Sequence, residues 1–273
     1  MFENQCWWIT GASSGIGAAL ARALAARGAS LVLSGRNVAA LETVAEACRD
    51  TLIVPFEATD LGAIPGLAER AWQWQGRIDG LVNNAGISQR SLAVDTTFAV
   101  YEKLIAVDLL APIALTQALL PRMVQAGGGR IVAISSVAGF VGVPLRSAYS
   151  AAKHGLVGYH DAVRAENAHL GIHVHVIAPG SVQTDVAKNA LLADGSRRGV
   201  SDTAIDGGMP PDEAAAAMLA AIEAGKPELI LAAGFEHDAA MLRRKDPESL
   251  FEQMSALVRA GYATKMAADG GKS

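Results

Sequence analysis

The chain has 273 residues, of which 51% are hydrophobic and 18% charged, and a formal net charge of −4. This composition excludes a disordered chain and indicates a globular protein that can bury its core within one α/β domain. The acidic balance, with no basic cluster longer than the pairs Arg197–Arg198 and Arg243–Arg244, argues against a nucleic-acid-binding protein.

The two cysteines, Cys6 and Cys48, are too isolated to form a disulfide framework or a metal motif, so we expect a cytoplasmic protein without a metal site. His173 and His175 alternate in an apolar run with no carboxylate at ligand spacing, which favours packing over metal binding. Residues 1–10 lack the pattern of a signal peptide, and no apolar stretch reaches the ~18 residues of a membrane helix. We therefore expect no membrane partner.

Short apolar runs alternate along the chain with longer segments of helical periodicity. Nearly continuous apolar runs are typical of parallel strands that are buried on both faces. The alternation predicts right-handed crossovers and therefore a Rossmann-like, doubly wound parallel sheet of about seven strands in a three-layer α/β/α domain. The expected strands are Cys6–Thr10, Leu31–Ser34, Leu52–Pro55, Ile78–Asn83, Arg130–Ser135, His173–Ala178 and Glu228–Ala232.

The pattern changes after the sixth expected strand. Residues 184–208 are small and polar with no clear period, which predicts a functional lid. A helix is expected at Pro211–Glu223, where prolines mark its start. We expect a nucleotide-binding domain over residues 1–235, lid included, and a C-terminal helical extension with a frayed tail over 236–273. The apolar stripe of this extension favours burial against its own domain, with an oligomer contact as the alternative.

A glycine-rich loop joins the first expected strand to the first expected helix. Residues 10–17 read Thr-Gly-Ala-Ser-Ser-Gly-Ile-Gly. Glycines permit a tight turn and let a pyrophosphate approach the helix N-terminus, where partial positive charge favours it. The expected strand before the loop and helix after it supply the context that a phosphate-binding loop requires. The alternative is an ordinary strand-to-helix turn.

Four further motifs follow in a fixed order: Asp60-Leu61, Asn83-Asn84-Ala85-Gly86, Ser136 with Tyr149-x-x-x-Lys153, and Pro179-Gly180. Together with the T-G-x-x-x-G-I-G loop, they make residues 5–232 resemble the classical short-chain dehydrogenases/reductases. The resemblance implies an enzyme that moves a hydride between a nicotinamide cofactor and a carbonyl or secondary alcohol.

The resemblance also implies which residues bind the cofactor. The Asp60 carboxylate would contact the adenine, although it can instead cap the helix expected to begin near Leu61. The segment from Pro179 to Thr184 would support the nicotinamide. The implied positions are Gly11, Ser13, Ser14, Gly15, Ile16, Gly17, Arg36, Asp60, Leu61, Asn83, Ala85, Gly86, Tyr149, Lys153, Pro179, Gly180, Val182 and Thr184.

The end of the second expected strand indicates which cofactor is preferred. An acidic residue there would bind a bare ribose, but the chain has Gly35 followed by Arg36. A guanidinium can pair with a 2′-phosphate, and Ser14 can add a hydroxyl contact, so we expect NADP(H) in preference to NAD(H). The alternative is that Arg36 only stacks on the adenine while either cofactor binds.

Tyr149 and Lys153 are four residues apart on an expected helix, which places them on one face. A nearby ammonium favours the ionised form of a phenol, so the pair is suited to moving a proton. The resemblance selects Ser136, and not Ser135, as the residue that holds the substrate oxygen. Tyr149 would give or take the proton, and Lys153 would assist it and hold the nicotinamide ribose.

The chain departs from the family pattern at Asp108, where an asparagine usually helps to hold a water linked to the lysine. An ionised carboxylate cannot donate a hydrogen bond, but it can attract Lys153 more strongly. We include Asp108 with Ser136, Tyr149 and Lys153 in the expected catalytic group, and expect activity to be retained.

The expected substrate is a small apolar carbonyl or alcohol. Its pocket would be formed by Ile87–Arg90, Val137–Leu145, Val186, Leu191 and Leu192, which are mostly apolar. Arg90 and Arg146 are expected to be exposed, with contact to an acidic group as the alternative. We expect a homodimer or homotetramer. Two other functions stay open: a regulatory protein that binds the cofactor without catalysis, and an epimerase or dehydratase with no net redox change.

Overall fold

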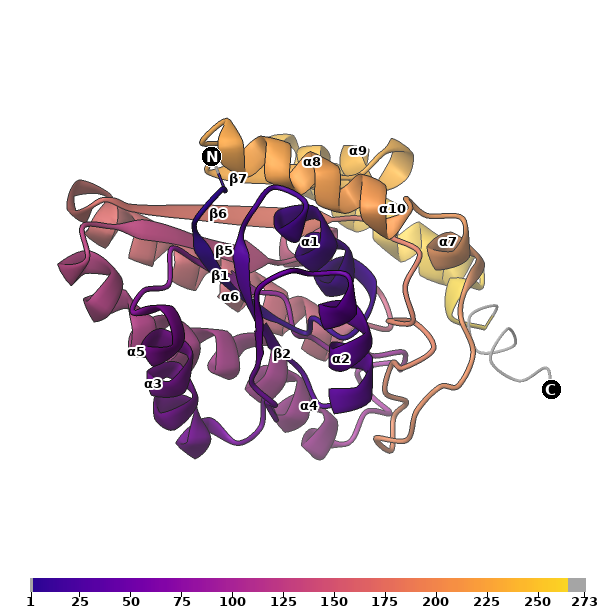
Figure 1. The fold of residues 1–273 in the computed structure, drawn as a ribbon. Helices are drawn as coiled ribbons and strands as arrows, with labels where there is room; N and C mark the ends of the chain where they lie inside the picture. The colour runs from indigo at the N-terminus through magenta and orange to yellow at the C-terminus, as the bar shows by residue number, and fades with distance from the viewer. Residues whose placement is uncertain (1, 265–273) are drawn as a thin grey trace.

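The computed structural model describes residues 2–264, and its centre is a seven-stranded parallel sheet (Figure 1). The strand order is β3-β2-β1-β4-β5-β6-β7, so the winding direction reverses between β1 and β4. The predicted fold class is confirmed. The strands are β1 (Cys6–Thr10), β2 (Ser30–Ser34), β3 (Thr51–Ile53), β4 (Gly80–Asn83), β5 (Gly129–Ile134), β6 (Ile172–Pro179) and β7 (Glu228–Leu231).

Helices cover both faces of the sheet. Along β1, Trp7 and Ile9 pack into one hydrophobic core and Cys6 and Trp8 into the other, because successive side chains of a strand point to opposite faces. The first core includes residues of α1 (Gly15–Ala25), α2 (Val38–Glu46) and α8 (Pro211–Glu223). The second includes residues of α3 (Ile64–Gln75), α5 (Ala111–Gln125) and α6 (Ser147–Asn167).

One helical run, Phe98–Gln125, is long and apolar enough by length and composition to cross a membrane, with a mean hydropathy of 1.8. It consists of α4 (Phe98–Ile105), a π-helical turn (Ala106–Leu110) and α5. A run of this length is not expected from the sequence, because charged residues such as Asp108 interrupt the apolar stretch, although they do not end the helix. Buried residues of α5 pack against the sheet, as in the core helix of a globular protein.

The C-terminal extension forms two helices, α9 (Gly234–Lys245) and α10 (Pro247–Arg259). Its buried residues Ala239, Ala240 and Leu250 form a small core with Val137 and Val141, which follow β5. The segment expected to line the substrate pocket thus packs on the extension. The predicted domain boundary near residue 235 stays a prediction.

Candidate active site

A cleft of about 670 Å³ lies where β1, β4, β5 and β6 end. Parallel sheets of this order bind ligands at the point where the strand order reverses. Most of the predicted site residues come together here. Those that line the cleft are Gly11, Ser13, Ser14, Gly15, Ile16, Arg36, Ala85, Gly86, Asp108, Ser136, Tyr149, Lys153, Pro179, Gly180, Val182 and Thr184.

Two predicted cofactor residues lie at a short helical turn outside the cleft lining. Asp60 is exposed, and its Oδ1 accepts a hydrogen bond from the main-chain N–H of Ala63 at 3.2 Å. Asp60 therefore caps the 3₁₀ turn that begins at Leu61, which is the alternative role raised for it above.

Two more predicted residues support the cleft from behind. The Asn83 side chain is buried in the core, where its amide donates to Thr116 Oγ1 at 3.1 Å. Gly17 packs against the glycine loop, and a Cβ added there would lie 2.2 Å from the carbonyl oxygen of Gly11. Direct cofactor contacts by these two residues stay predictions.

The glycine loop has the geometry of a cradle. Gly11 has a φ of +66° and Gly15 a φ of +53°, a region that favours glycine. A Cβ on Gly11 would lie 2.8 Å from Ala85 Cα, and one on Gly15 would lie 2.9 Å from Thr184 Cγ2. The first turn of α1 has no side-chain cap at Ser14, so its N–H groups are available to an anion. These features fit the pyrophosphate of a dinucleotide.

Asn84 braces this loop. Its side-chain amide donates to the main-chain carbonyls of Thr10 at 2.9 Å and Gly11 at 3.3 Å, while Thr10 Oγ1 accepts from the main-chain N–H groups of Asn84 and Ala85. The residues after β4 and the end of β1 are therefore held as one unit.

Arg36 lines the cleft beside Gly35, as the sequence predicted. Its side chain is 58% exposed and its Nη1 lies 4.0 Å from Glu57 Oε2. An exposed ion pair of this length is weak, so the guanidinium can leave Glu57 for a phosphate.

The two serines that follow β5 have different partners. Ser135 is buried and its hydroxyl donates to the main-chain carbonyl of Lys153 at 3.1 Å. Ser136 is half-buried, and its Oγ accepts from the N–H of Ala138 at 3.2 Å. Because that oxygen is used only as an acceptor here, its hydroxyl proton is free to donate to a substrate oxygen. The geometry suits Ser136 for the predicted role.

Tyr149 and Lys153 lie one turn apart on α6, and both line the cleft. Lys153 Nζ is 5.6 Å from the centre of the Tyr149 ring. It lies 3.3 Å from Asp108 Oδ2 and donates to the carbonyl of Ile134 at 3.1 Å. The other Asp108 oxygen accepts from the N–H of Ile87 at 2.9 Å.

Gly86 lies against this buried pair. A Cβ on Gly86 would be 3.1 Å from Asp108 Oδ2 and 3.4 Å from Lys153 Nζ. Burial raises the pKa of Asp108, and the Lys153 charge only partly offsets this. Burial would lower the pKa of Lys153, but the Asp108 charge outweighs it and raises the pKa. Lys153 is therefore an ammonium at neutral pH.

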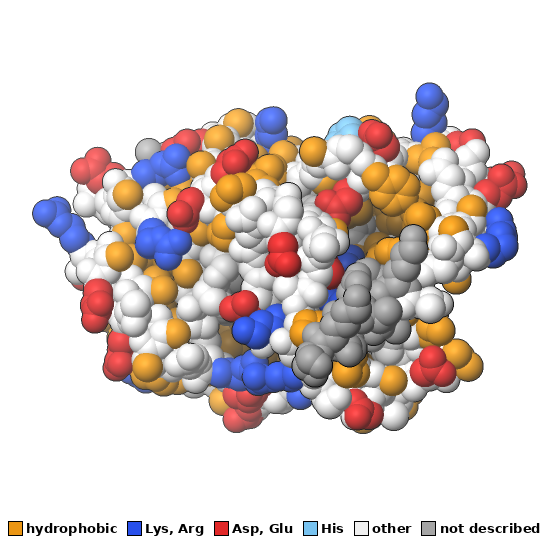
Figure 2. Space-filling model, turned by 90° about the vertical axis from the view of Figure 1, so that its right-hand side faces the viewer, with side chains coloured by type: hydrophobic (Ala, Val, Ile, Leu, Met, Phe, Trp, Pro, Cys, Tyr) orange, Lys and Arg blue, Asp and Glu red, His pale blue; other side chains and the backbone are white. Residues whose placement is uncertain are grey.

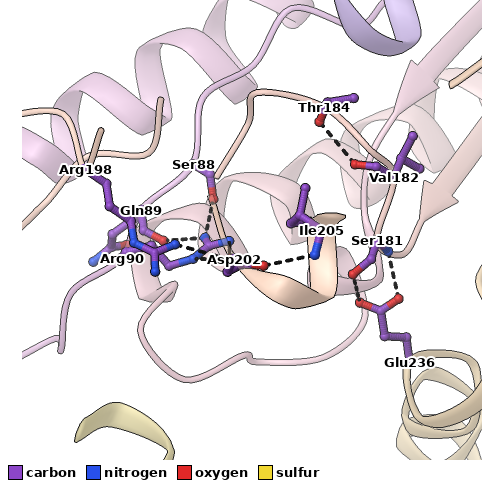
Figure 3. Close-up of polar contacts among 10 residues, drawn as sticks. All are labelled: Ser88, Gln89, Arg90, Ser181, Val182, Thr184, Arg198, Asp202, Ile205 and Glu236. Atoms are coloured by element: carbon purple, nitrogen blue, oxygen red, sulfur yellow. Dashed lines mark hydrogen bonds and ion pairs between the residues drawn. The ribbon is translucent and has the colours of Figure 1, made fainter. Parts of the chain in front are cut away.

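The lid segment, residues 184–208, is fixed by a buried ion pair (Figure 3). Arg90 donates to Asp202 Oδ2 through Nη2 at 2.9 Å and Nε at 3.3 Å, and through Nη1 to Ser88 Oγ and the Gln89 carbonyl. Arg198 Nη1 adds a contact to the same oxygen at 3.4 Å. Arg90 is 8% exposed, so the prediction that it is exposed was wrong, because Asp202 provides a buried partner.

This network shifts the pKa of its members. Burial opposes ionisation of Asp202, but the hydrogen bonds and charge of Arg90 and the N–H of Ile205 lower its pKa. Burial, together with the charge of Arg146, lowers the pKa of Arg90 to about 10. Both groups remain ionised at neutral pH.

Four residues were given no role from the sequence: Asn84 and Glu57, which line the cleft, and Asp202 and Glu236, which hold segments that line it. Asn84 lies within a recognised motif and was the most accessible to prediction. Asp202 lies in a segment without periodicity, and its partner Arg90 is distant in the chain. Glu236 lies on α9, and its partner Ser181 follows β6, so folding alone brings these two residues together. The lid also adds Ile205 to the cleft lining.

Comparison with known proteins decides the family. The family model described as "short chain dehydrogenase" matches residues 5–194. The chain belongs to the short-chain dehydrogenase/reductase family. It is therefore an NAD(P)-dependent oxidoreductase, and the resemblance drawn from its motifs is confirmed.

Relatives of this short-chain dehydrogenase/reductase span most of the chain. The chain is 40% identical to the bovine (Bos taurus) "Dehydrogenase/reductase SDR family member 7B", over 96% of this chain and 84% of the relative. Among solved structures, a short-chain dehydrogenase from Streptomyces avermitilis is 28% identical, with a TM-score of 0.77 over 95% of this chain and 98% of that one. Levodione reductase is 27% identical, with a TM-score of 0.76 over 85% and 96%.

Proposed function

We propose that this short-chain dehydrogenase/reductase transfers a hydride between NADP(H) and a small apolar carbonyl compound or secondary alcohol. The observation that carries the proposal is that Ser136, Tyr149 and Lys153 line the same cleft as the glycine loop and the segment from Pro179 to Thr184. The bound cofactor would supply or accept the hydride, and the protein would orient the substrate and move the proton.

The residues of the chain divide this task. The Ser136 hydroxyl donates a hydrogen bond to the substrate oxygen. The Tyr149 hydroxyl gives that oxygen its proton in reduction and takes it back in oxidation. Lys153, held as an ammonium by Asp108, lies near the Tyr149 ring and places a positive charge beside the group that moves the proton.

Preference for NADP(H) is supported by the charges of the residues that follow β2. Gly35 replaces the carboxylate that a bare ribose would need, and Arg36 beside it lines the cleft. Glu57 also lines this part of the cleft, but it follows β3 and does not take the place of the missing acid after β2.

An apolar substrate is supported by the lining on the lid side, where Ile87, Val186, Leu191 and Ile205 contribute side chains. Asn189 and Arg197 add polar groups that can orient it. Charged side chains of both signs are mixed on the face shown in Figure 2, without the basic field of a nucleic-acid-binding surface. The cytoplasmic location and the homodimer or homotetramer stay predictions.

The test combines binding with turnover. Titration with NADPH and NADH separately should give tighter binding of NADPH, and the preferred cofactor is then used with a panel of apolar ketones, aldehydes and alcohols. Tyr149→Phe should lower turnover by about 10²–10⁴-fold because the proton donor is lost, without weakening cofactor binding.

Tyr159→Phe is the matched control, since Tyr159 lies on the same helix but does not line the cleft. Full turnover by Tyr149→Phe would contradict the assigned role. Product formation without any change in cofactor oxidation state would instead support an epimerase or dehydratase.

A further inference from the structure

The helix that follows the last strand reaches back to the turn after β6. Ser181 donates to Glu236 twice, from its main-chain N–H to Oε2 at 2.7 Å and from its hydroxyl to Oε1 at 2.8 Å (Figure 3). Both oxygens of one carboxylate thus hold a single residue of the turn. Hydrogen bonds to an ionised acceptor are about twice as strong as neutral ones, so this contact fixes the turn firmly.

The carboxylate also packs directly on the chain at Gly180. A Cβ on Gly180 would lie 2.2 Å from Glu236 Oε2 and 2.9 Å from Ala232 Cβ, so only glycine allows this approach. The N–H of Gly180 donates to the carbonyl of Leu231 at 2.9 Å. The extension and β7 therefore hold one side of the turn.

The other side of the turn is held by Met209. Its N–H donates to the carbonyl of Ser181, and its carbonyl accepts from the N–H of Gln183, both at 3.0 Å. Val182 lies between these bonds and faces the cleft, which Gly180 and Thr184 also line. Glu236 is not among the lining residues, so it can affect a ligand only through the turn.

We propose that Glu236 is a positioning residue for the nicotinamide half of the cofactor, and that it acts through Ser181 by fixing the turn 179–184 before the cofactor binds. A turn that is already ordered loses less conformational freedom on binding, which increases affinity. The inference rests on the proposed function, since it assumes that a dinucleotide occupies the cleft.

The proposal predicts an effect confined to one half of the cofactor. The adenosine half would lie at the glycine loop and Arg36, and Glu236 has no hydrogen bond to either among the described residues. Removing the Glu236 carboxylate should therefore weaken a full dinucleotide and leave its adenosine fragment unaffected.

Calorimetric titration of the whole protein with NADPH and with 2′,5′-ADP tests this directly. Glu236→Ala, which removes both hydrogen bonds to Ser181, should weaken NADPH binding by about tenfold, which corresponds to ~1.4 kcal/mol, and leave 2′,5′-ADP binding unchanged. Glu236→Gln keeps one acceptor oxygen, so its affinity for NADPH should lie between those of the wild type and Glu236→Ala. Ser181→Ala loses only the hydrogen bond from the hydroxyl group, so it should weaken NADPH binding less than Glu236→Ala does and leave 2′,5′-ADP binding unchanged.

Glu248→Ala is the control, because Glu248 is an exposed carboxylate of the same extension, and it should bind both ligands as the wild type does. If Glu236→Ala weakens the binding of both ligands equally, or changes the binding of neither, the proposal is overturned. If Glu236→Ala does not fold, Glu236→Gln and Ser181→Ala decide by the same criterion.

Failure of the proposed function gives a different result: the wild type itself would bind neither NADPH nor NADH, which overturns the inference as well. If the wild type prefers NADH, NADH and 5′-ADP replace the two probes, and the same outcomes apply.

Discussion

Asp108 and Asp202 are both buried carboxylates that pair with a buried cation, yet their pKa values move in opposite directions. Asp108 has one N–H donor, from Ile87, and one ammonium at 3.3 Å. Asp202 accepts from Arg90, Arg198 and the N–H of Ile205. With few donors, burial raises the pKa of the carboxyl group, and with several donors, hydrogen bonds and positive charge lower it.

The difference separates a structural pair from a functional one. The Asp202 pair is fully hydrogen-bonded and joins the lid segment to the residues after β4. The Asp108 pair has fewer hydrogen bonds and lies beside Tyr149, the proposed proton donor. Buried pairs with few hydrogen bonds are poor contributors to stability, and their presence in a cleft points to a role in chemistry.

The largest effect is expected from breaking the structural pair. Asp202→Asn or Arg90→Met should lower the free energy of unfolding of the lid region by about 3 kcal/mol, because a buried charge loses its principal counter-charge. Hydrogen exchange of peptides covering residues 184–208 measures this.

Asp194→Asn is the control, since Asp194 is an exposed carboxylate of the same segment. Exchange in Asp202→Asn that is no faster than in this control would show that the pair does not hold the lid.

A smaller effect is expected from breaking the functional pair. Asp108→Asn removes the negative charge that lies 3.3 Å from Lys153 and that outweighs the effect of burial, so the pKa of Lys153 should fall. The midpoint of the alkaline limb of the pH–rate profile for alcohol oxidation should therefore move down, with the plateau rate largely retained.

Asp79→Asn provides the comparison, since Asp79 is a buried carboxylate that accepts from the N–H of Cys6, outside the cleft lining. A midpoint that stays in place or moves up in Asp108→Asn would remove Asp108 from the proton chemistry.

The smallest effect is a difference in the pH dependence of stability. The pKa of Asp202 is lowered on folding, so its stabilisation is present above the unfolded value of ~3.9 and is lost as the pH falls through the folded value. The pKa of Asp108 is raised, so its contribution is present below ~3.9 and is lost as the pH rises through the folded value.

Unfolding by denaturant at a series of pH values, for the wild type, Asp202→Asn and Asp108→Asn, measures these slopes. For Asp202→Asn, the loss in free energy of unfolding relative to the wild type should become smaller towards low pH. For Asp108→Asn, the stability of the wild type relative to the variant should increase towards low pH. If the stability differences of the two variants change with pH in the same direction, the contrast between Asp108 and Asp202 is contradicted.

The parts of the molecule predicted from the sequence are those with local signals. The strands are short apolar runs, and the helix at Pro211–Glu223 coincides with α8, because periodicity and prolines are read within a few residues. The glycine loop and the Tyr149–Lys153 spacing are also local, and the cleft contains both.

The parts that were missed depend on contacts distant in the chain. Arg90 was predicted to be exposed because a lone arginine in a loop carries no local sign of its partner, which lies 112 residues away. The segment after β5 was assigned to the pocket because the packing of α9 and α10 against Val137 and Val141 is not visible in either segment alone.

The bond from Ser181 to Glu236 has a consequence for how the enzyme is made. The glycine loop and Tyr149 leave the ribosome before Glu236, the residue that holds the turn after β6, because Glu236 lies on α9, near the end of the described chain. Strand β7, which pairs with β6, is also translated late. If Glu236 positions the nicotinamide half as proposed, the growing chain completes the glycine loop before it completes this turn, and a chain terminated before residue 236 would lack the contact that fixes it.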